Sequence, residues 1–116
     1  MPRHIESQIQ RACKKWFDYQ YGQFAPLLFA VPYGGLRGKK EAAIMKAEGM
    51  TAGVADMILL VSKKGYASLC IEFKTAKGRQ TQHQKDWQRI AEIHGNKYVI
   101  VRSFDDFVKA ITAYLC

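Results

Sequence analysis

The sequence predicts an α/β domain in which helices cover the faces of a central sheet. Two observations predict this class. Apolar residues recur at helical spacing in several stretches, and short apolar runs bounded by glycine, proline or charged residues lie between them. Together they give the order α-β-α-β-β-α-β-α, and packing helices on a sheet is the arrangement that buries such elements. We expect residues 1–116 to form this one domain.

Four stretches have the apolar periodicity of amphipathic helices. Thr81 with Gln84, and Ser103 with Asp106, have the spacing of capping boxes and therefore predict the starts of the last two helices. The predicted helices run from Ile5 to about Gly22, over residues 38–48, from Thr81 to His94, and from Ser103 to Leu115.

Four apolar runs predict strands, and the second and third are joined by the tight turn Lys63-Lys64-Gly65. Those two strands should therefore form an antiparallel hairpin. The predicted strands run from Leu27 to Val31, from Asp56 to Ser62, from Tyr66 to Lys74, and from Tyr98 to Val101.

Composition places the chain among ordinary globular proteins, since 48% of its 116 residues are apolar and 24% are charged. No apolar run approaches the roughly 20 residues of a membrane span. No signal peptide is visible. Cys13, Cys70 and Cys116 are too widely spaced for a metal cluster, so we expect free thiols, the first two packed among apolar neighbours. These features predict a cytoplasmic protein that does not enter a membrane.

The chain is strongly basic, with 18 Lys and Arg against 10 Asp and Glu and a formal charge of +8. An excess of this size suggests a polyanionic partner, nucleic acid first and an anionic membrane surface second. A charge that serves only solubility is the alternative. The sequence contains neither GxxxxGK nor GxGxxG, so we expect no nucleotide cofactor.

The third predicted strand carries two charged residues among apolar ones. Because side chains alternate across a strand, Glu72 and Lys74 share one face, and Leu69, Ile71 and Phe73 share the other. Burying the three apolar groups against a helix fixes this register, since a slip by one residue would place the charges in the core.

Asp56 begins the preceding strand, after the bend formed by residues 51–55. In a hairpin centred on Lys64 the paired residue numbers sum to about 128, so Asp56 pairs near Glu72. Two adjacent ionised carboxylates repel, and either a shared proton or a cation relieves the repulsion. All-oxygen ligands suit Mg²⁺ or Mn²⁺. The alternative is structural: Asp56 ends a strand and Glu72 forms an ion pair with Lys74.

Four segments resemble consecutive signatures of the VRR-Nuc (virus-type replication-repair nuclease) family, which lies in the PD-(D/E)xK nuclease superfamily. This resemblance implies a restriction-endonuclease-like core with a mixed sheet, in its compact stand-alone form. Ala55 departs from the family pattern, in which proline precedes the aspartate, and Tyr33 stands where asparagine is frequent. The matching segments are residues 31–37, 46–56, 71–79 and 81–87.

The resemblance implies a role for each site residue. Asp56 and Glu72 would bind the metal ion together with the backbone carbonyl of Phe73, and Glu6 would approach it from the first helix. Lys74 and Gln84 would complete the catalytic set with the two carboxylates.

Two of these roles have local alternatives. Gln84 lies on one side of its helix with Trp87 and Ala91, yet it also fits the capping box with Thr81. Glu6 borders an apolar helix face, yet it also fits as an acid in a first helical turn.

Basic residues around the predicted site suit the phosphate backbone, which they would position without reading bases. Solvated turn charge is the alternative for Lys39 and Lys40, and it is at least as good an interpretation of Lys63 and Lys64. The predicted nucleic-acid contacts are Arg37, Lys39, Lys40, Lys77, Arg79 and Lys85.

The prediction is therefore a Mg²⁺- or Mn²⁺-dependent nuclease that hydrolyses phosphodiester bonds in DNA. The family resemblance further implies branched substrates such as four-way (Holliday) junctions and a homodimer, in a bacterial cell or a phage-infected host. A non-catalytic nucleic-acid-binding module, or a nuclease acting on RNA or linear DNA, is the alternative. The apolar face of the last helix is either core or dimer interface; it comprises Phe104, Phe107, Val108, Ile111 and Leu115.

Overall fold

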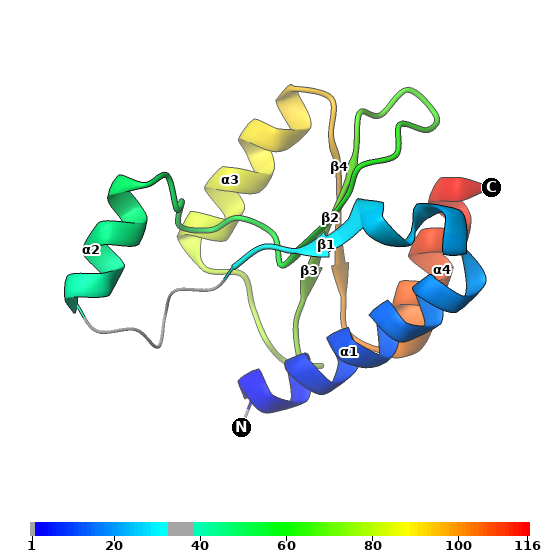
Figure 1. The fold of residues 1–116 in the computed structure, drawn as a ribbon, viewed down its shortest axis with the longest axis horizontal. Helices are drawn as coiled ribbons and strands as arrows, with labels where there is room; N and C mark the ends of the chain where they lie inside the picture. The colour runs from blue at the N-terminus through cyan, green and yellow to red at the C-terminus, as the bar shows by residue number, and fades with distance from the viewer. Residues whose placement is uncertain (1, 33–38) are drawn as a thin grey trace.

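The computed structural model describes residues 2–32 and 39–116, with side chains from Ile5 onward (Figure 1). The predicted order of helices and strands is confirmed, with one 3₁₀ helix added. The helices are α1 (Pro2–Gln20), η1 (Gly22–Leu27), α2 (Lys39–Ala47), α3 (Gln82–Ile93) and α4 (Phe104–Leu115), and the strands are β1 (Leu28–Ala30), β2 (Met57–Leu59), β3 (Leu69–Phe73) and β4 (Lys97–Val101). Arg37 and Tyr33 lie outside the described residues.

The four strands form one mixed sheet in the order β1-β2-β3-β4. β1 pairs with β2 and β2 with β3 in antiparallel fashion, and β4 runs parallel to β3. A parallel neighbour needs a crossover connection, and α3 provides it. β3 is therefore a central strand, and all five of its residues are buried.

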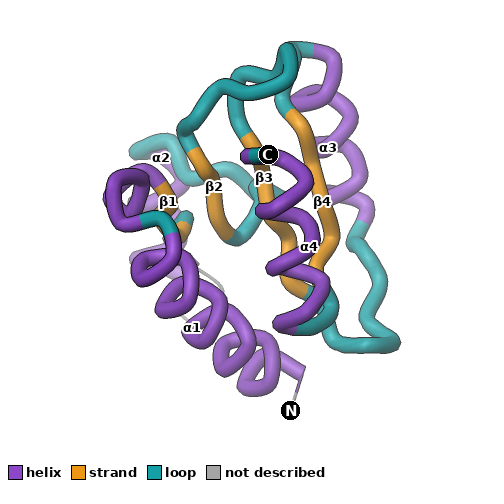
Figure 2. The backbone as a smooth tube through the Cα atoms, turned by 90° about the vertical axis from the view of Figure 1, so that its right-hand side faces the viewer, coloured by secondary structure: helices purple, strands orange, loops and turns teal. Residues whose placement is uncertain are grey.

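One face of the sheet carries the main core, which α1 and α4 cover (Figure 2). Leu69, Ile71 and Phe73 point into this core, so the predicted alternation along β3 is confirmed. The apolar face of α4 belongs to it as well, since Phe107 and Ile111 are fully buried. Phe107, Ile111 and Leu115 of this face are therefore core, whereas Phe104 is 38% exposed.

The opposite face carries a smaller core under α3. It contains Ala55, Cys70 and Tyr98, with Trp87 of α3 packed against them. The rings of Trp87 and Tyr98 lie 6.2 Å apart. Glu72 points to this face because it alternates with Ile71 and Phe73. The charged face of β3 is therefore enclosed by a helix and not left to solvent.

The helix signals in the sequence are largely confirmed. Thr81 and Gln84 form a complete capping box. Ser103 caps α4 through the Asp106 amide, but the Asp106 carboxylate accepts from the amide of Arg102 and not from that of Ser103. α1 begins at Pro2, earlier than predicted, so Glu6 lies beyond its first turn. The alternative role of Glu6 as a first-turn acid is therefore wrong.

Three strands, β1, β2 and β3, are shorter than predicted, and the ends of β1 and β3 have local reasons. β1 begins at Leu28 because the Leu28 amide donates to Ala25 and closes a 3₁₀ turn. β3 begins at Leu69 because the Ala67 amide donates to Gly95, in the turn before β4, and not to β2.

The hairpin between β2 and β3 contains an extra residue. Its turn is closed by Lys63 and Tyr66, whose numbers sum to 129, whereas β2 and β3 pair with sums of 128, as in Met57 with Ile71. Three residues, 60–62, therefore face two, 67–68, as in a β-bulge. This bulge ends the regular ladder and shifts the register of everything beyond it by one residue.

Both predicted buried thiols, Cys13 and Cys70, are buried and unpaired, and Cys116 is exposed. Burial raises the pKa of the Cys13 thiol to about 12, so it stays protonated as a small apolar group. Among the residues that the structure describes, no helix is both long enough and apolar enough to cross a membrane.

Candidate active site

The bulged hairpin decides where the two predicted carboxylates lie. If the register of the turn continued unbroken, Asp56 would lie opposite Phe73 and would point to the other face from Glu72. The observed sum of 128 instead places Asp56 opposite Glu72. Asp56 is held there because its Oδ2 accepts a hydrogen bond of 2.7 Å from the backbone amide of Phe73. The predicted pair is therefore formed.

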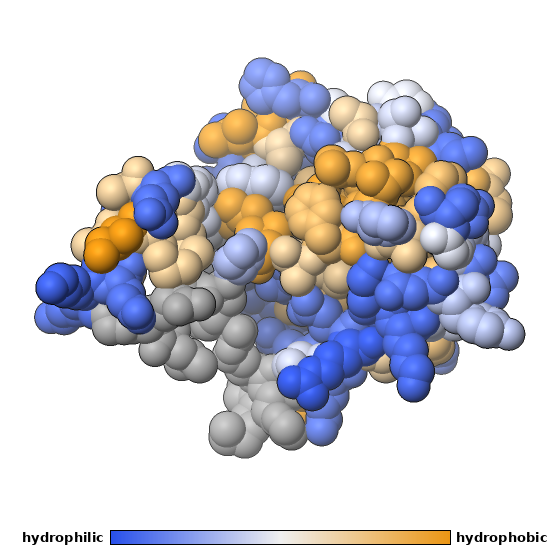
Figure 3. Space-filling view, in the orientation of Figure 1, coloured by the Kyte–Doolittle hydropathy of each residue, from blue (hydrophilic) through white to orange (hydrophobic). Residues whose placement is uncertain are grey.

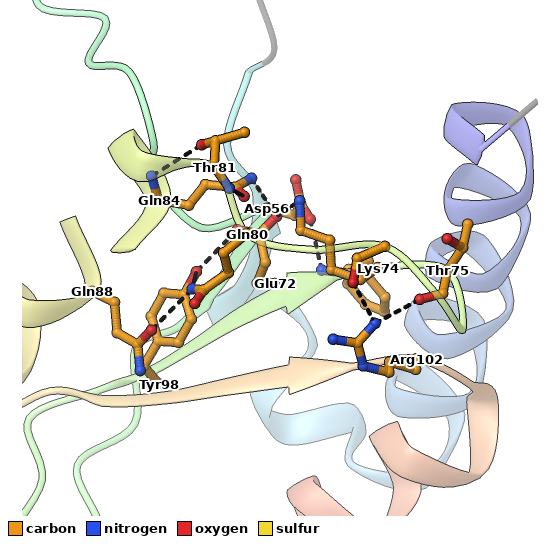
Figure 4. Close-up of polar contacts among 12 residues, drawn as sticks. Asp56, Glu72, Lys74, Thr75, Gln80, Thr81, Gln84, Gln88, Tyr98 and Arg102 are labelled. Atoms are coloured by element: carbon orange, nitrogen blue, oxygen red, sulfur yellow. Dashed lines mark hydrogen bonds and ion pairs between the residues drawn. The ribbon is translucent and has the colours of Figure 1, made fainter. Parts of the chain in front are cut away.

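Glu72 is almost completely buried, with 2% of its surface exposed. Its Oε1 accepts a bond of 3.1 Å from the hydroxyl of Tyr98, and its Oε2 accepts one of 2.9 Å from the amide of Gln84 (Figure 4). The Nζ of Lys74 lies 3.9 Å from Oε2. A hydrogen-bond donor therefore fixes each oxygen of Glu72, and an ammonium group lies beside it.

The surroundings favour the protonated form of Glu72. Burial is the largest cause, and the charge and hydrogen bond of Asp56 add to it, so the pKa of Glu72 rises from 4.5 to about 8. Lys74 and Tyr98 oppose the rise without cancelling it. Burial and the neighbouring carboxylates also raise the pKa of Tyr98, which keeps its hydroxyl a donor. Negative charge on both carboxylates is therefore unfavourable here, and a proton on Glu72 or a cation beside the pair would relieve it.

Gln84 serves both of the roles that its sequence position allows. Its carbonyl oxygen accepts from the Thr81 amide at 2.9 Å and completes the capping box, while its NH₂ group donates to Glu72. The two interpretations of this residue are therefore compatible. The helix cap fixes the amide so that its NH₂ group points at the carboxylate.

Gly53 brings the loop before Asp56 against the start of α3. Its φ is +86°, and a Cβ built on it would lie 2.3 Å from the carbonyl oxygen of His83. Only glycine fits both the backbone conformation and the contact. The close approach places Asp56 and Gln84 around the same buried carboxylate.

Sequence reasoning missed a polar chain behind Glu72. Gln80 donates to the Tyr98 hydroxyl at 3.3 Å and to Gln88 at 2.9 Å, and Tyr98 in turn donates to Glu72. The available signal was the tyrosine at an inward position of a strand, because a buried hydroxyl needs a partner. The partner could not be named without the register between β3 and β4.

Arg102 is the other residue that sequence reasoning missed. Its Nη1 donates to the carbonyls of Thr75 and Gly78, both at 2.7 Å (Figure 4). It thereby holds the loop that follows Lys74. Nothing in the spacing of the chain indicates this contact, which spans 27 residues.

Two grooves meet at this site. The α1 groove, of about 710 Å³, runs from Glu6 and Asp56 between α1 and residues 30–32. The α3 groove, of about 680 Å³, leads from the same two residues to the start of α3 and contains Glu72, Lys74 and Gln84. Glu6 therefore borders the site, as predicted from the resemblance, and it lies where the grooves join.

Five of the six predicted nucleic-acid contacts are described by the structure, and they lie outside these grooves. Lys39, Lys40, Lys77, Arg79 and Lys85 are all exposed. None of the five is among the residues that line the two grooves. The cationic groups that do line them belong to Arg11, Lys14, Lys15, Lys46 and Lys74.

The donor set suits a hard divalent cation. Asp56 and Glu72 supply carboxylate oxygens, which have more lone pairs than the hydrogen bonds donated to Asp56 Oδ2 and to both oxygens of Glu72 occupy. Within residues 2–32 and 39–116 no three His, Cys, Asp or Glu side chains come close enough to hold a metal ion by themselves. A cation here would therefore draw further ligands from the backbone and from water.

No model of a protein family and no curated protein matches this chain. Among solved structures, a chain described as "VRR_NUC domain protein" superposes on this one with a TM-score of 0.83. The match covers 95% of this chain and 87% of the other, at 24% sequence identity. The chain therefore has the fold of a VRR-Nuc domain, a mixed four-stranded sheet flanked by helices. The fold predicted from the four sequence segments is confirmed.

Proposed function

We propose that this protein is a nuclease of the VRR-Nuc type that uses Mg²⁺ or Mn²⁺ to hydrolyse phosphodiester bonds in DNA. The observation that carries the proposal is the pairing of buried Glu72 with Asp56, with the Lys74 ammonium 3.9 Å from Glu72, where two grooves meet. The net charge of +8 and the likeness in fold to a VRR-Nuc domain support it.

In this proposal Asp56, Glu72 and the carbonyl of Phe73 hold the cation, and Glu6 approaches it from α1. When bound, such an ion supplies a Lewis acid that stabilises negative charge on a phosphate and lowers the pKa of water. Lys74 orients the attacking water and stabilises charge that develops on the phosphate oxygens. Gln84 fixes Glu72 through the bond that its amide donates.

The finer parts of the proposal concern substrate, assembly and compartment. We infer branched DNA, such as a four-way junction, and a homodimer that presents two sites to two strands. The exposed apolar side chains of Leu27, Phe29 and Leu60, on and beside the edge strand β1, support an assembly. The free thiols suit a reducing cytoplasm. Light scattering measures the dimer, with twice the mass of 13.2 kDa as the expected result.

A cleavage assay tests the activity. Labelled linear, flapped and four-way DNA and an RNA control are incubated with protein in Mg²⁺, in Mn²⁺ and in EDTA. We expect metal-dependent cutting of DNA that Glu72→Gln and Lys74→Ala abolish, while Glu48→Gln, at an exposed carboxylate, cuts like the wild type. Binding without any cutting would instead favour a non-catalytic module. Equal cutting by Glu72→Gln would refute the proposed site.

A further inference from the structure

The α1 groove is a second path away from the site, and none of the five predicted DNA contacts that the structure describes lies in it. It shares Glu6 and Asp56 with the α3 groove and then follows the polar side of α1. A polymer that crosses the site must leave it on both sides of the bond that is cut. If the α3 groove takes the strand on one side of that bond, the α1 groove has the position required for the other side.

The wall of the α1 groove is basic beyond the site itself. Arg11, Lys14 and Lys15 line it, and Arg11 and Lys15 are exposed. Lys14 is held in place, because its Nζ donates to Asp18 at 2.6 Å and to the carbonyl of Ala25 at 2.7 Å. Since Asp18 offsets Lys14, the net positive charge of this stretch comes from Arg11 and Lys15.

These two side chains are available to a ligand. Within the part of the chain that the structure describes, no hydrogen bond or ion pair engages the guanidinium of Arg11 or the ammonium of Lys15. Figure 3 shows hydrophilic side chains over the region of α1, in the lower part of the view. The apolar side of the same helix packs in the core through Cys13 and Phe17. The backbone of α1 therefore fixes where its cations stand.

The spacing along α1 suits a phosphate chain. A helix rises 1.5 Å per residue, so Arg11 stands about 7.5 Å and Lys15 about 13.5 Å beyond Glu6 along the axis. Phosphates of one B-form strand follow one another at about 3.4 Å along its axis. The two cations therefore lie about two and four phosphates from the site.

We propose that the α1 groove binds the phosphate backbone of the DNA strand on one side of the cut bond, through Arg11 and Lys15. The inference rests on the proposed nuclease function and adds a binding surface to it. The contacts are made to phosphates, so they position the strand without selecting its sequence.

Salt-dependent binding tests the groove without any cutting. The Kd for a labelled DNA is measured in EDTA at several salt concentrations for the wild type and for Arg11→Ala/Lys15→Ala. Each lost phosphate contact lowers the slope of log Kd against log salt by about one, so we expect a fall of about two. Lys63→Ala/Lys109→Ala removes the same charge at exposed positions outside both grooves and should keep the wild-type slope.

The outcomes separate the groove from the nuclease proposal. Equal slopes for Arg11→Ala/Lys15→Ala and Lys63→Ala/Lys109→Ala would overturn the proposal that the α1 groove binds DNA, even if the wild type cuts DNA. A wild type that binds through Arg11 and Lys15 but never cuts would overturn the nuclease proposal and support the groove. Arg11→Lys/Lys15→Arg keeps both charges and should restore the slope, which excludes misfolding as the cause.

Shortened substrates give an independent test once the cut position is mapped. Two substrates are made, one with the strand trimmed to a single nucleotide on the 5′ side of the cut and the other on the 3′ side. The Kd of the wild type and of Arg11→Ala/Lys15→Ala is measured for each substrate. On one of the two trimmed substrates the difference should disappear, because the phosphates that reach Arg11 and Lys15 are gone. A difference that survives both trims would contradict the proposal.

Discussion

At the scale of single residues, Glu72 determines what the site can do. Its burial and its contact with Asp56 raise its pKa to about 8. Four side chains surround it, and each reaches it from a different element or loop: Asp56, Lys74, Gln84 and Tyr98. A structural ion pair between Glu72 and Lys74 alone would not require a second carboxylate in contact, and this favours a cation-binding role.

The raised pKa of Glu72 predicts how stability depends on pH without metal. Between about 4.5 and 8 the folded protein retains a proton on Glu72 that the unfolded chain has released. Stability from this group is therefore complete below pH 4.5, falls as the pH rises towards 8, and levels off above it. Urea unfolding in EDTA at pH 5 and pH 9 measures this loss.

Glu72→Gln isolates this contribution from other titrating groups. Glutamine has no proton to release, so the variant should lose less stability than the wild type between pH 5 and pH 9. An equal loss in both proteins would show that the pKa of Glu72 is not raised in the folded state.

Tyr98 predicts a second effect at this scale. Tyr98→Phe removes the hydroxyl that orients Glu72, and the loss of such a supporting bond typically weakens metal binding by about 10-fold or more. Titration calorimetry with Mn²⁺ measures the change. Tyr19→Phe is the matched control, because Tyr19 is 88% exposed and should bind Mn²⁺ like the wild type. Unchanged affinity in Tyr98→Phe would exclude this role.

At the scale of elements, the site depends on the bulged hairpin and on the loop packed against α3. The bulge at residues 60–62 puts Asp56 and Glu72 on one face, and Gly53 lets the loop before Asp56 touch α3. Neither the bulge nor Gly53 would contact a metal ion. Both determine whether the carboxylates of Asp56 and Glu72 lie close together.

Gly53→Ala should disrupt the site more than backbone strain alone explains. Alanine at a positive φ destabilises by about 1 kcal/mol or more, and here its Cβ would also collide with the His83 carbonyl. Gly65→Ala is the control, since Gly65 has the same φ of +86° with nothing within 4 Å of its Cβ position. We expect Gly53→Ala to lose more stability and DNA cleavage than Gly65→Ala. Equal effects in both assays would contradict the packing role.

The elements also show why part of the site could be predicted and part could not. The tight turn at residues 63–65 ties β2 to β3, so counting along the chain brings Asp56 near Glu72, whereas the bulge that puts both on one face has no signal in the sequence. Tyr98 and Arg102 come from β4 and its end, which pair with β3 through a crossover. A long crossover does not determine from the sequence which residue of β4 pairs with which residue of β3. These two partners of the site were therefore missed.

The surface cations show a different limit of the sequence. Lys77 and Arg79 are basic and follow Lys74, but neither lines a groove, and their contact with nucleic acid stays a prediction. The cations of α1 are more than 40 residues from Asp56 in sequence. Only the packing of α1 in the core of the folded chain brings Arg11 and Lys15 into the groove that leads from the site.

At the scale of the whole molecule, a sheet flanked by helices holds a buried carboxylate pair where two grooves join. The likeness in fold to a VRR-Nuc domain fits this arrangement. The excess of positive charge favours a polyanionic partner, and the grooves give that partner a path through the site. Charge, grooves and carboxylates are thus consistent with one activity on DNA.

Direct measurement of Mn²⁺ binding by titration calorimetry tests the central claim that Asp56 and Glu72 hold one cation together. Asp56→Asn and Glu72→Gln should each lower the affinity for Mn²⁺ by at least about 10- to 100-fold. A loss of this size is typical when a residue that only orients a metal ligand is removed, so the loss of a ligand itself should be no smaller. Since both act on one ion, the double variant should bind little more weakly than the weaker single variant, and Glu48→Gln should match the wild type. Wild-type affinity in the double variant would contradict the account.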